Sequence, residues 1–328
     1  MKRCYIGVDT SNYTTSVGIV DEDGAVLANL KQLLPVAEGE RGLRQSDALF
    51  HHVKNLPELL DRAGEYLGGR EIAAVGVSVS PRNRAGSYMP CFLAGEAAAH
   101  ALCAASGAPL FRFSHQCGHI MAALLSAGRL DLLDAPAFGA FHVSGGTTEL
   151  LRVSFRENGF SAESCGGTKD LNAGQVIDRI GVALGLRFPC GPALEELALT
   201  YKGKVPRRKP SLCGSHINLS GLENMALKLW QDTGDAPQTA AFVFSYLAEA
   251  LAGAVQHFLG EQGALPMVFA GGVMCNSFLR RRLSRFPDAS FADPRLSADN
   301  AVGSAALAWQ CSIRGCADKA AGKERTDG

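Results

Sequence analysis

The sequence lacks the features that mark several common classes of protein. Lys plus Arg and Asp plus Glu both number 32, so no excess charge draws the whole chain to nucleic acid or to an anionic membrane. No two of the ten cysteines form a CxxC pair, which argues against a zinc ribbon or a thioredoxin-type motif. No apolar run reaches the roughly 18 residues of a membrane span, and no signal-like apolar region opens the chain. We therefore expect a cytoplasmic protein with reduced thiols and no membrane partner.

Standard nucleotide and zinc motifs are also missing. The sequence contains neither the GxxxxGK[ST] pattern of a P-loop nor the GxGxxG pattern of a Rossmann fold. It has no HExxH pattern and no nucleophile constellation, so a protease is disfavoured.

What is present is a plan of strands and helices that occurs twice. Residues 4–33 predict strands joined by tight turns, residues 46–67 predict a helix, and residues 138–155 predict a second strand, glycine turn and strand. Helices are then expected at residues 172–186, 192–199, 221–230 and 237–260, a buried strand at 266–273 and a closing helix at 299–310. Such a repeat predicts a duplicated α/β architecture with a ligand cleft between the halves.

The repeat also predicts where the lobes begin and end. We expect an N-terminal lobe over residues 1–112 and a C-terminal lobe over residues 113–312, with a closing helix able to pack back on the first lobe. Residues 313–328 are expected to form a polar tail.

Three turns rich in Gly, Ser and Thr are candidates for holding a nucleotide. Asp9 and Ser11 lie at the first hairpin tip, where hydroxyl and N–H groups can cradle phosphate. Gly145 and Gly146 let the backbone approach a ligand closely in the second hairpin. The pair Gly271 and Gly272 ends an apolar strand directly before a helix whose start carries Asn276. Hairpin turns favour such residues for conformational reasons alone, but three in one chain favour a nucleotide cleft. The combination resembles the actin-like ATPase and sugar-kinase fold, in which two related α/β lobes clamp a nucleotide.

His115 and His119 are the strongest metal-ligand candidates. On a helix, two imidazoles four residues apart can share one cation, and chance alone gives roughly 0.2 such pairs among eight histidines. Cys117 lies between them but points to another side of the helix. The missing carboxylate is best supplied by Asp299, at the start of the closing helix. Two histidines and one carboxylate leave coordination positions open and suit iron or zinc acting as a Lewis acid.

Together with this histidine pair, five further segments resemble the TsaD family in order and spacing. They are VSGGTTEL (143–150), residues 172–198, LSGL (219–222), AGGVMCNSFLRRRL (270–283) and SADNAVGSA (297–305). The resemblance implies transfer of a threonylcarbamoyl group from threonylcarbamoyl-adenylate to the exocyclic amine of the tRNA adenosine that follows the anticodon. It also implies partners, namely tRNA, a TsaB-like paralogous subunit, a TsaE-like ATPase and a TsaC-like enzyme that supplies the adenylate.

The resemblance assigns roles to residues one by one. His115, His119 and Asp299 match the ligands of one divalent metal, iron or zinc. The bound nucleotide, ATP or the adenylate, is matched by His142, Val143, Ser144, Gly145 and Gly146, and further by Asp178, Gly191 and Asn276. We also expect Thr147, in the same turn as Gly146, to contact the nucleotide.

Several positions depart from the family pattern and leave other readings open. The acidic pair of the first turn is replaced by Tyr13 and Thr14, and a Gly-Pro-Gly turn by Ser80 to Arg82. Thr147 replaces a histidine or asparagine of the family pattern, Gln175 replaces a glutamate, and Glu223 replaces a lysine. The alternatives are a paralogue that acts on a different acceptor and a non-catalytic nucleotide-binding scaffold. For tRNA contact, the candidate basic segments are residues 201–210 and 280–285.

Overall fold

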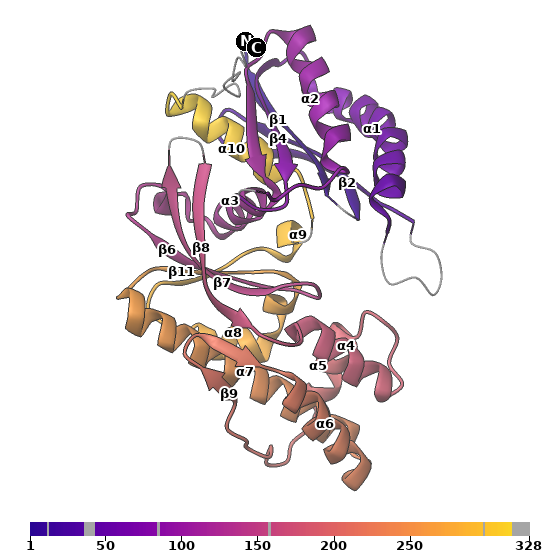
Figure 1. Cartoon of the computed structure of the whole chain (residues 1–328), viewed down its shortest axis with the longest axis vertical. Helices are drawn as coiled ribbons and strands as arrows, with labels where there is room; N and C mark the ends of the chain where they lie inside the picture. The colour runs from indigo at the N-terminus through magenta and orange to yellow at the C-terminus, as the bar shows by residue number, and fades with distance from the viewer. Residues whose placement is uncertain (12, 36–42, 84–85, 157–158, 298, 317–328) are drawn as a thin grey trace, which may run out of the picture. The chain divides into compact units, whose positions relative to one another are not determined.

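The computed structural model describes residues 1–11, 13–35, 43–83, 86–156, 159–297 and 299–316 (Figure 1). The chain divides into two compact units. Unit 1 comprises Met1–Leu130, Phe155–Ser161 and Asp299–Gly328, and unit 2 comprises Asp131–Ser154 and Ala162–Ala298. The boundary predicted at residues 112 and 113 falls inside unit 1, and most of the predicted polar tail lies outside the described residues.

Unit 1 is built on a five-stranded mixed sheet in the order β3-β2-β1-β4-β5. The strands are β1 (Arg3–Ser11), β2 (Thr14–Asp21), β3 (Val26–Leu33), β4 (Glu71–Ser80) and β5 (Leu110–Ser114). The first three strands pair in antiparallel fashion, as predicted for the opening hairpins, while β4 and β5 run parallel to β1. The carboxyl ends of β1, β4 and β5 therefore lie at one edge of the sheet.

Helices cover both faces of this sheet (Figure 1). They are α1 (Gln45–Leu67), α2 (Phe92–Ser106), α3 (His115–Ala127) and α10 (Val302–Ile313). Thr10 of β1 faces α2, since the N–H of Gly95 donates to its hydroxyl at 3.2 Å. Gly7 faces α10, and a side chain there would collide with the carbonyl of Ala301. Because strand residues alternate between faces, Asp9 lies on the α10 side with Gly7.

Unit 2 contains a seven-stranded sheet in the order β12-β11-β6-β7-β8-β10-β9. The strands are β6 (Phe138–Val143), β7 (Thr148–Arg156), β8 (Gly159–Thr168), β9 (Ser211–Cys213), β10 (His216–Asn218), β11 (Met267–Ala270) and β12 (Ala289–Phe291). β6 pairs antiparallel with β7 and parallel with β11, so the second predicted hairpin adjoins the strand that ends in two glycines.

The helices of unit 2 surround a core built on one long helix. They are α4 (Ala173–Ala183), α5 (Gly191–Thr200), α6 (Ser220–Thr233), α7 (Ala236–Gln262), α8 (Ser277–Leu283) and the short α9 (Pro294–Ser297). Two 3-10 turns, η1 (Leu130–Leu133) and η2 (Gly272–Cys275), complete the chain. Helix α7 contributes fifteen buried residues to this core.

Contrary to the sequence prediction, α7 is long and apolar enough to cross a membrane by length and composition. Its most apolar 18-residue stretch has a mean hydropathy of 1.3, and 67% of that stretch is buried. A buried core helix meets the same criterion, and among the described residues no second helix meets it.

The fold also differs from the prediction in two smaller respects. Strands β8, β9 and β10 are absent from the predicted plan, because Ser, Glu and Gly dilute the apolar pattern of β8 and because β9 and β10 are only three residues long. The closing helix begins at Val302 and not at Asp299, since the side-chain oxygen of Asn300 caps the N–H of Val302 at 3.1 Å.

Candidate metal centre

The two histidines lie on the first two turns of α3, directly after β5. Ser114 caps this helix by accepting a hydrogen bond from the N–H of Cys117 at 3.3 Å. His115 and His119 share one face, with ring centroids 4.3 Å apart. Cys117 faces elsewhere, because its Sγ lies 3.5 Å from the carbonyl oxygen of Phe160.

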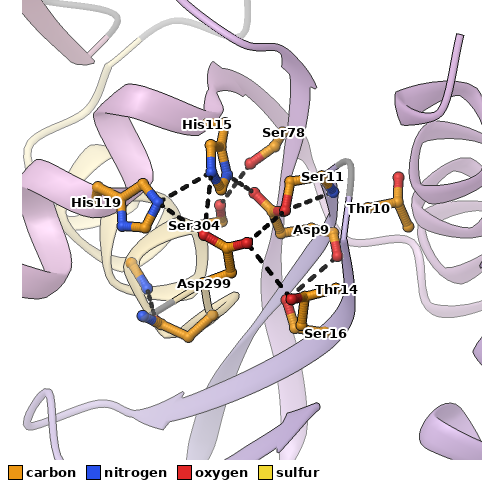
Figure 2. Close-up of polar contacts among 12 residues, drawn as sticks. Asp9, Thr10, Ser11, Thr14, Ser16, Ser78, His115, His119, Asp299 and Ser304 are labelled. Atoms are coloured by element: carbon orange, nitrogen blue, oxygen red, sulfur yellow. Dashed lines mark hydrogen bonds and ion pairs between the residues drawn. The ribbon is translucent and has the colours of Figure 1, made fainter. Parts of the chain in front are cut away.

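Asp299 joins the two imidazoles although it lies far away in the sequence (Figure 2). Its Oδ1 is 3.2 Å from Nε2 of His119 and 3.6 Å from Nε2 of His115, and the two Nε2 atoms are 2.9 Å apart. One ligand atom from each residue lies within 4.8 Å of the others. The structure thus brings together the three residues predicted as metal ligands, all within unit 1.

These separations fit atoms that share one cation. Ligand atoms about 2.1 Å from a cation lie about 3.0 Å apart at right angles and about 3.4 Å apart at tetrahedral angles. The three measured separations bracket these values. The side chains of His115, His119 and Asp299 are 19%, 14% and 31% exposed, so a further ligand can reach the cluster. Two imidazoles and one carboxylate form a donor set that suits iron or zinc.

Asp9 contacts both the histidine cluster and the backbone of the first hairpin. Its side chain is 1% exposed, and its Oδ2 lies 2.8 Å from Nδ1 of His115. Its Oδ1 accepts the backbone N–H of Ser11 at 3.0 Å. Both carboxylate oxygens therefore have protein partners, and the phosphate contact of the hydroxyl and N–H groups in this turn stays a prediction.

Two hydroxyls of the first hairpin hold the second oxygen of Asp299 (Figure 2). Ser11 Oγ and Thr14 Oγ1 donate to Asp299 Oδ2 at 3.5 and 3.4 Å. Asp299 Oδ1 is thereby left to face the histidines. Sequence reasoning did not find Thr14, because its role depends on residues 285 positions apart meeting in space.

The carboxylates and imidazoles of the cluster shift one another's pKa values. Burial alone would raise the pKa of Asp9 and Asp299, but the imidazoles hold the pKa of Asp9 below its usual value and that of Asp299 well below it. Burial alone would lower the pKa of His115, but the two carboxylates raise it to about 10. The carboxylates thus favour positive charge at this point, and a divalent cation would supply it while releasing the proton of His115.

The residues predicted to hold a nucleotide lie mainly in unit 2, at the carboxyl ends of β6 and β11. The turn after β6 is closed by two hydrogen bonds between Ser144 and Thr147, of 2.7 and 3.1 Å. Gly271 has φ +97°, and a side chain there would collide with the carbonyl of Val143. Ala270 pairs with His142 across the parallel strands. The segments 142–147 and 271–272 therefore lie side by side, at the edge where open α/β sheets bind ligands.

Asp178, Gly191 and Asn276 form a second connected group in unit 2. Asp178 Oδ1 accepts the N–H of Cys190 at 2.8 Å, which holds it at the start of α5, where Gly191 is the first residue. Asn276 caps α8 by accepting the N–H groups of Phe278 and Leu279 at 3.0 and 3.2 Å. Helix α5 and the start of α8 are joined by Glu195, whose Oε1 accepts the N–H of Ser277 at 2.7 Å. Glu195 was not predicted, and its spacing within a helix gives no local signal.

The positions that depart from the family pattern have structural partners of their own. Gln175 completes the capping box of α4, and Glu223 pairs with Arg179 at 3.1 Å. Both line an open hollow of about 660 Å³ beside Asp178, together with apolar residues that include Phe188. Ser80 donates to the carbonyl of Arg82 at 3.2 Å, and Tyr13 is 41% exposed.

The fold and the cluster together define a class of protein. The whole chain is similar to a ROK family glucokinase from Streptomyces griseus, with a TM-score of 0.50, 16% identity, and coverage of 94% of this chain and 99% of that chain. The structure is therefore an actin-like ATPase and sugar-kinase fold, and unit 1 adds a cluster of two histidines and one carboxylate.

The sequence relatives identify the family within that class. Residues 36–306 match TsaD, the tRNA N6-adenosine threonylcarbamoyltransferase family, and the chain belongs to it. A Streptococcus suis protein of that name is 30% identical over 316 residues, which cover 91% of this chain and 89% of the relative. A relative of the same name from Methanopyrus kandleri is 28% identical over 311 residues, which cover 93% of this chain and 85% of the relative.

Proposed function

We propose that this chain is a metal-dependent acyltransferase that moves a threonylcarbamoyl group from threonylcarbamoyl-adenylate to N6 of the tRNA adenosine following the anticodon. The observation that carries the proposal is the convergence of His115, His119 and Asp299, with donor atoms spaced for one cation. Membership of the TsaD family supports the same activity.

The reaction needs no nucleophile from the protein. The N6 amine attacks the carbamoyl carbonyl carbon, the new C–N bond replaces the C–O bond to the phosphate, AMP leaves and the amine gives up one proton. When bound, iron or zinc acts as a Lewis acid on the carbonyl oxygen. His115, His119 and Asp299 would hold the cation, while Ser11 and Thr14 fix which oxygen of Asp299 faces it.

Unit 2 carries the proposed nucleotide site. The 142–147 turn and Gly271–Gly272 offer backbone groups at the carboxyl ends of two strands, a common place for a phosphate to bind. Asp178 lies at an apolar hollow of about 660 Å³, where a carboxylate can accept hydrogen bonds from ribose hydroxyls. These features support binding of ATP or the adenylate.

Of the two basic segments, residues 201–210 are the better candidate for contact with tRNA. In the other segment, Arg280 donates to the carbonyls of Met274 and Ala292, and Arg282 pairs with Glu249 at 2.9 Å. Those two side chains are thus already engaged within unit 2. A tRNA substrate agrees with a cytoplasmic location, and the expected TsaB-like, TsaE-like and TsaC-like partners belong to the same proposal.

The test is reconstitution with threonine, bicarbonate, ATP, an adenylate-forming enzyme, the partner proteins and tRNA. Mass spectrometry of the tRNA nucleosides should detect threonylcarbamoyladenosine with the wild-type chain and a loss of at least about a hundredfold with His119→Ala. The matched control, Glu65→Gln on the exposed face of α1, should retain activity. Consumption of the adenylate without tRNA modification would favour a different amine acceptor, which the departures at Tyr13 and Glu223 make the second candidate. Unchanged adenylate and unmodified tRNA would overturn the proposal.

A further inference from the structure

We propose that Asp9 and Ser78 are positioning residues that fix the protonation pattern of His115, so that its Nε2 is free to bind a cation. This inference rests on the proposed metal site, but not on the identity of the acyl group or of its acceptor. It concerns residues of β1, β4, α3 and α10, all of which lie in unit 1.

Asp9 is surrounded by hydrogen-bond donors. The backbone N–H of Ser11 donates to Oδ1 at 3.0 Å, and a hydrogen bond from the Ser78 hydroxyl helps to lower the pKa of this carboxyl. Oδ2 faces Nδ1 of His115 at 2.8 Å. An ionised carboxylate can only accept, so Nδ1 of His115 must carry the hydrogen of this bond. The remaining nitrogen, Nε2, then points to the cluster, where a cation can displace any proton it carries and bind its lone pair.

A buried hydroxyl chain keeps this arrangement in one orientation (Figure 2). The Oγ atoms of Ser78 and Ser304 lie 3.2 Å apart, and both side chains are fully buried. Because Ser78 gives its proton to Asp9, Ser304 must donate to Ser78. This series of side chains leads from Ser304 on α10 through Ser78 on β4 and Asp9 on β1 to His115 on α3. Each member has its partner, which is the condition under which a buried polar network is stable and rigid.

An asparagine at position 9 has the same shape but the wrong hydrogen-bonding pattern. One of its two terminal atoms would be an NH2 group, which cannot accept a hydrogen bond. If that group faces Ser11, two donors oppose each other. If it faces His115, the imidazole must accept at Nδ1 and carry its proton on Nε2, where the cation would bind. Either arrangement lowers metal affinity without removing a metal ligand.

The experiment measures Zn²⁺ affinity of the metal-free full-length chain by competition with a chromophoric chelator at neutral pH. Asp9→Asn should weaken Zn²⁺ binding by about 10- to 100-fold, the usual effect of losing the partner of a metal-bound histidine. Ser78→Ala removes one donor to Asp9 and should weaken binding by about 2- to 10-fold. Glu65→Gln removes a remote acidic charge and should leave the affinity unchanged.

Two further measurements separate positioning from folding. Circular dichroism and urea unfolding of each metal-free variant report whether the chain is folded at the assay temperature, and Ser78→Ala keeps the test decisive if Asp9→Asn does not fold. At saturating Co²⁺, folded Asp9→Asn should keep the visible absorption of the wild-type site, whereas His115→Ala should change it, because only the latter removes a ligand. A purely structural role for Asp9 would lower the unfolding free energy and leave the Zn²⁺ affinity of the folded protein unchanged.

Wild-type Zn²⁺ affinity in folded Asp9→Asn or in Ser78→Ala would overturn this inference and leave the proposed transferase standing. Failure of the wild-type chain to bind Zn²⁺, Fe²⁺ or Co²⁺ would overturn both this inference and the metal dependence proposed above. Absence of tRNA modification with normal Zn²⁺ affinities would affect the proposed function alone.

Discussion

A buried histidine of unit 1 should make the stability of this chain depend on pH in a predictable way. His52 of α1 is 0% exposed, and its Nδ1 shares a 2.8 Å hydrogen bond with Thr15 Oγ1. Asn55 Nδ2 donates to the same oxygen at 3.2 Å. Burial lowers the pKa of His52 from 6.5 to about 4, against smaller opposing effects of the Ser11 backbone and the charge of Asp9.

The sign and size of the effect follow from linkage. Above pH 6.5 His52 is neutral in both the folded and the unfolded chain and contributes nothing. As the pH falls from 6.5 towards 4, the unfolded chain binds a proton that the folded chain excludes, so the unfolding free energy decreases. A pKa difference of about 2.5 units corresponds to about 3 kcal/mol, and we expect a loss of about 2 to 3 kcal/mol.

The assay is urea unfolding between about pH 7.5 and pH 4.5 for the wild type, His52→Gln and His51→Gln. The adjacent His51 is partly exposed, and its charge makes only a small contribution to the low pKa of His52, so it serves as the matched control. Protonation of carboxylates lowers the stability of all three proteins alike, so the difference between the wild type and His52→Gln isolates the histidine. That difference should shrink by about 2 to 3 kcal/mol as the pH falls, while His51→Gln follows the wild type. Parallel curves for the wild type and His52→Gln would refute the reasoning.

Three further changes have expected outcomes. Gly7→Ala places a methyl group against the carbonyl of Ala301 and should lower the unfolding free energy by about 1 to 3 kcal/mol, measured in urea, whereas a loss below 0.5 kcal/mol would contradict the close packing of α10 on β1. Thr14→Val removes one hydrogen bond to Asp299 and should weaken Zn²⁺ binding by about 2- to 10-fold in a chelator competition. An unchanged Zn²⁺ affinity would show that the Thr14 hydroxyl does not orient Asp299. Replacing the basic residues 207–209 with glutamate should weaken tRNA binding in a filter-binding assay. The slope of the affinity against salt concentration should decrease by the equivalent of about two to three phosphate contacts, and an unaltered slope would exclude this segment from contact.

Local patterns were enough to predict most of the fold. The first helix was expected at residues 46–67 and spans Gln45–Leu67, because its apolar positions repeat with a helical period. Strand β8 was missed because its segment Ser161–Gly167 does not alternate apolar with polar residues and much of it is exposed. The neighbouring strands, and not its own sequence pattern, therefore determine its place in the sheet.

The candidate site was likewise predicted in part and missed in part. The spacing of His115 and His119 is local, and Asp299 was chosen as the carboxylate at the start of the closing helix, in agreement with the family resemblance. The role of Asp9 was not predicted, since it depends on the parallel pairing of β1 with β4 and of β4 with β5, which brings the start of α3 to Asp9. One signal was available: a charged residue continues the apolar strand on the face of Gly7, and a buried charge requires a partner.

The order of synthesis gives the cluster a further property. The ribosome completes His119 about 180 residues before Asp299, and at typical rates of synthesis this gap lasts roughly 10 to 40 s. During that interval the nascent first unit lacks both its third ligand and the helix that covers one side of its sheet. Capture of the proposed cation by all three side chains would therefore coincide with closure of that unit, and metal loading would then be a late step of folding.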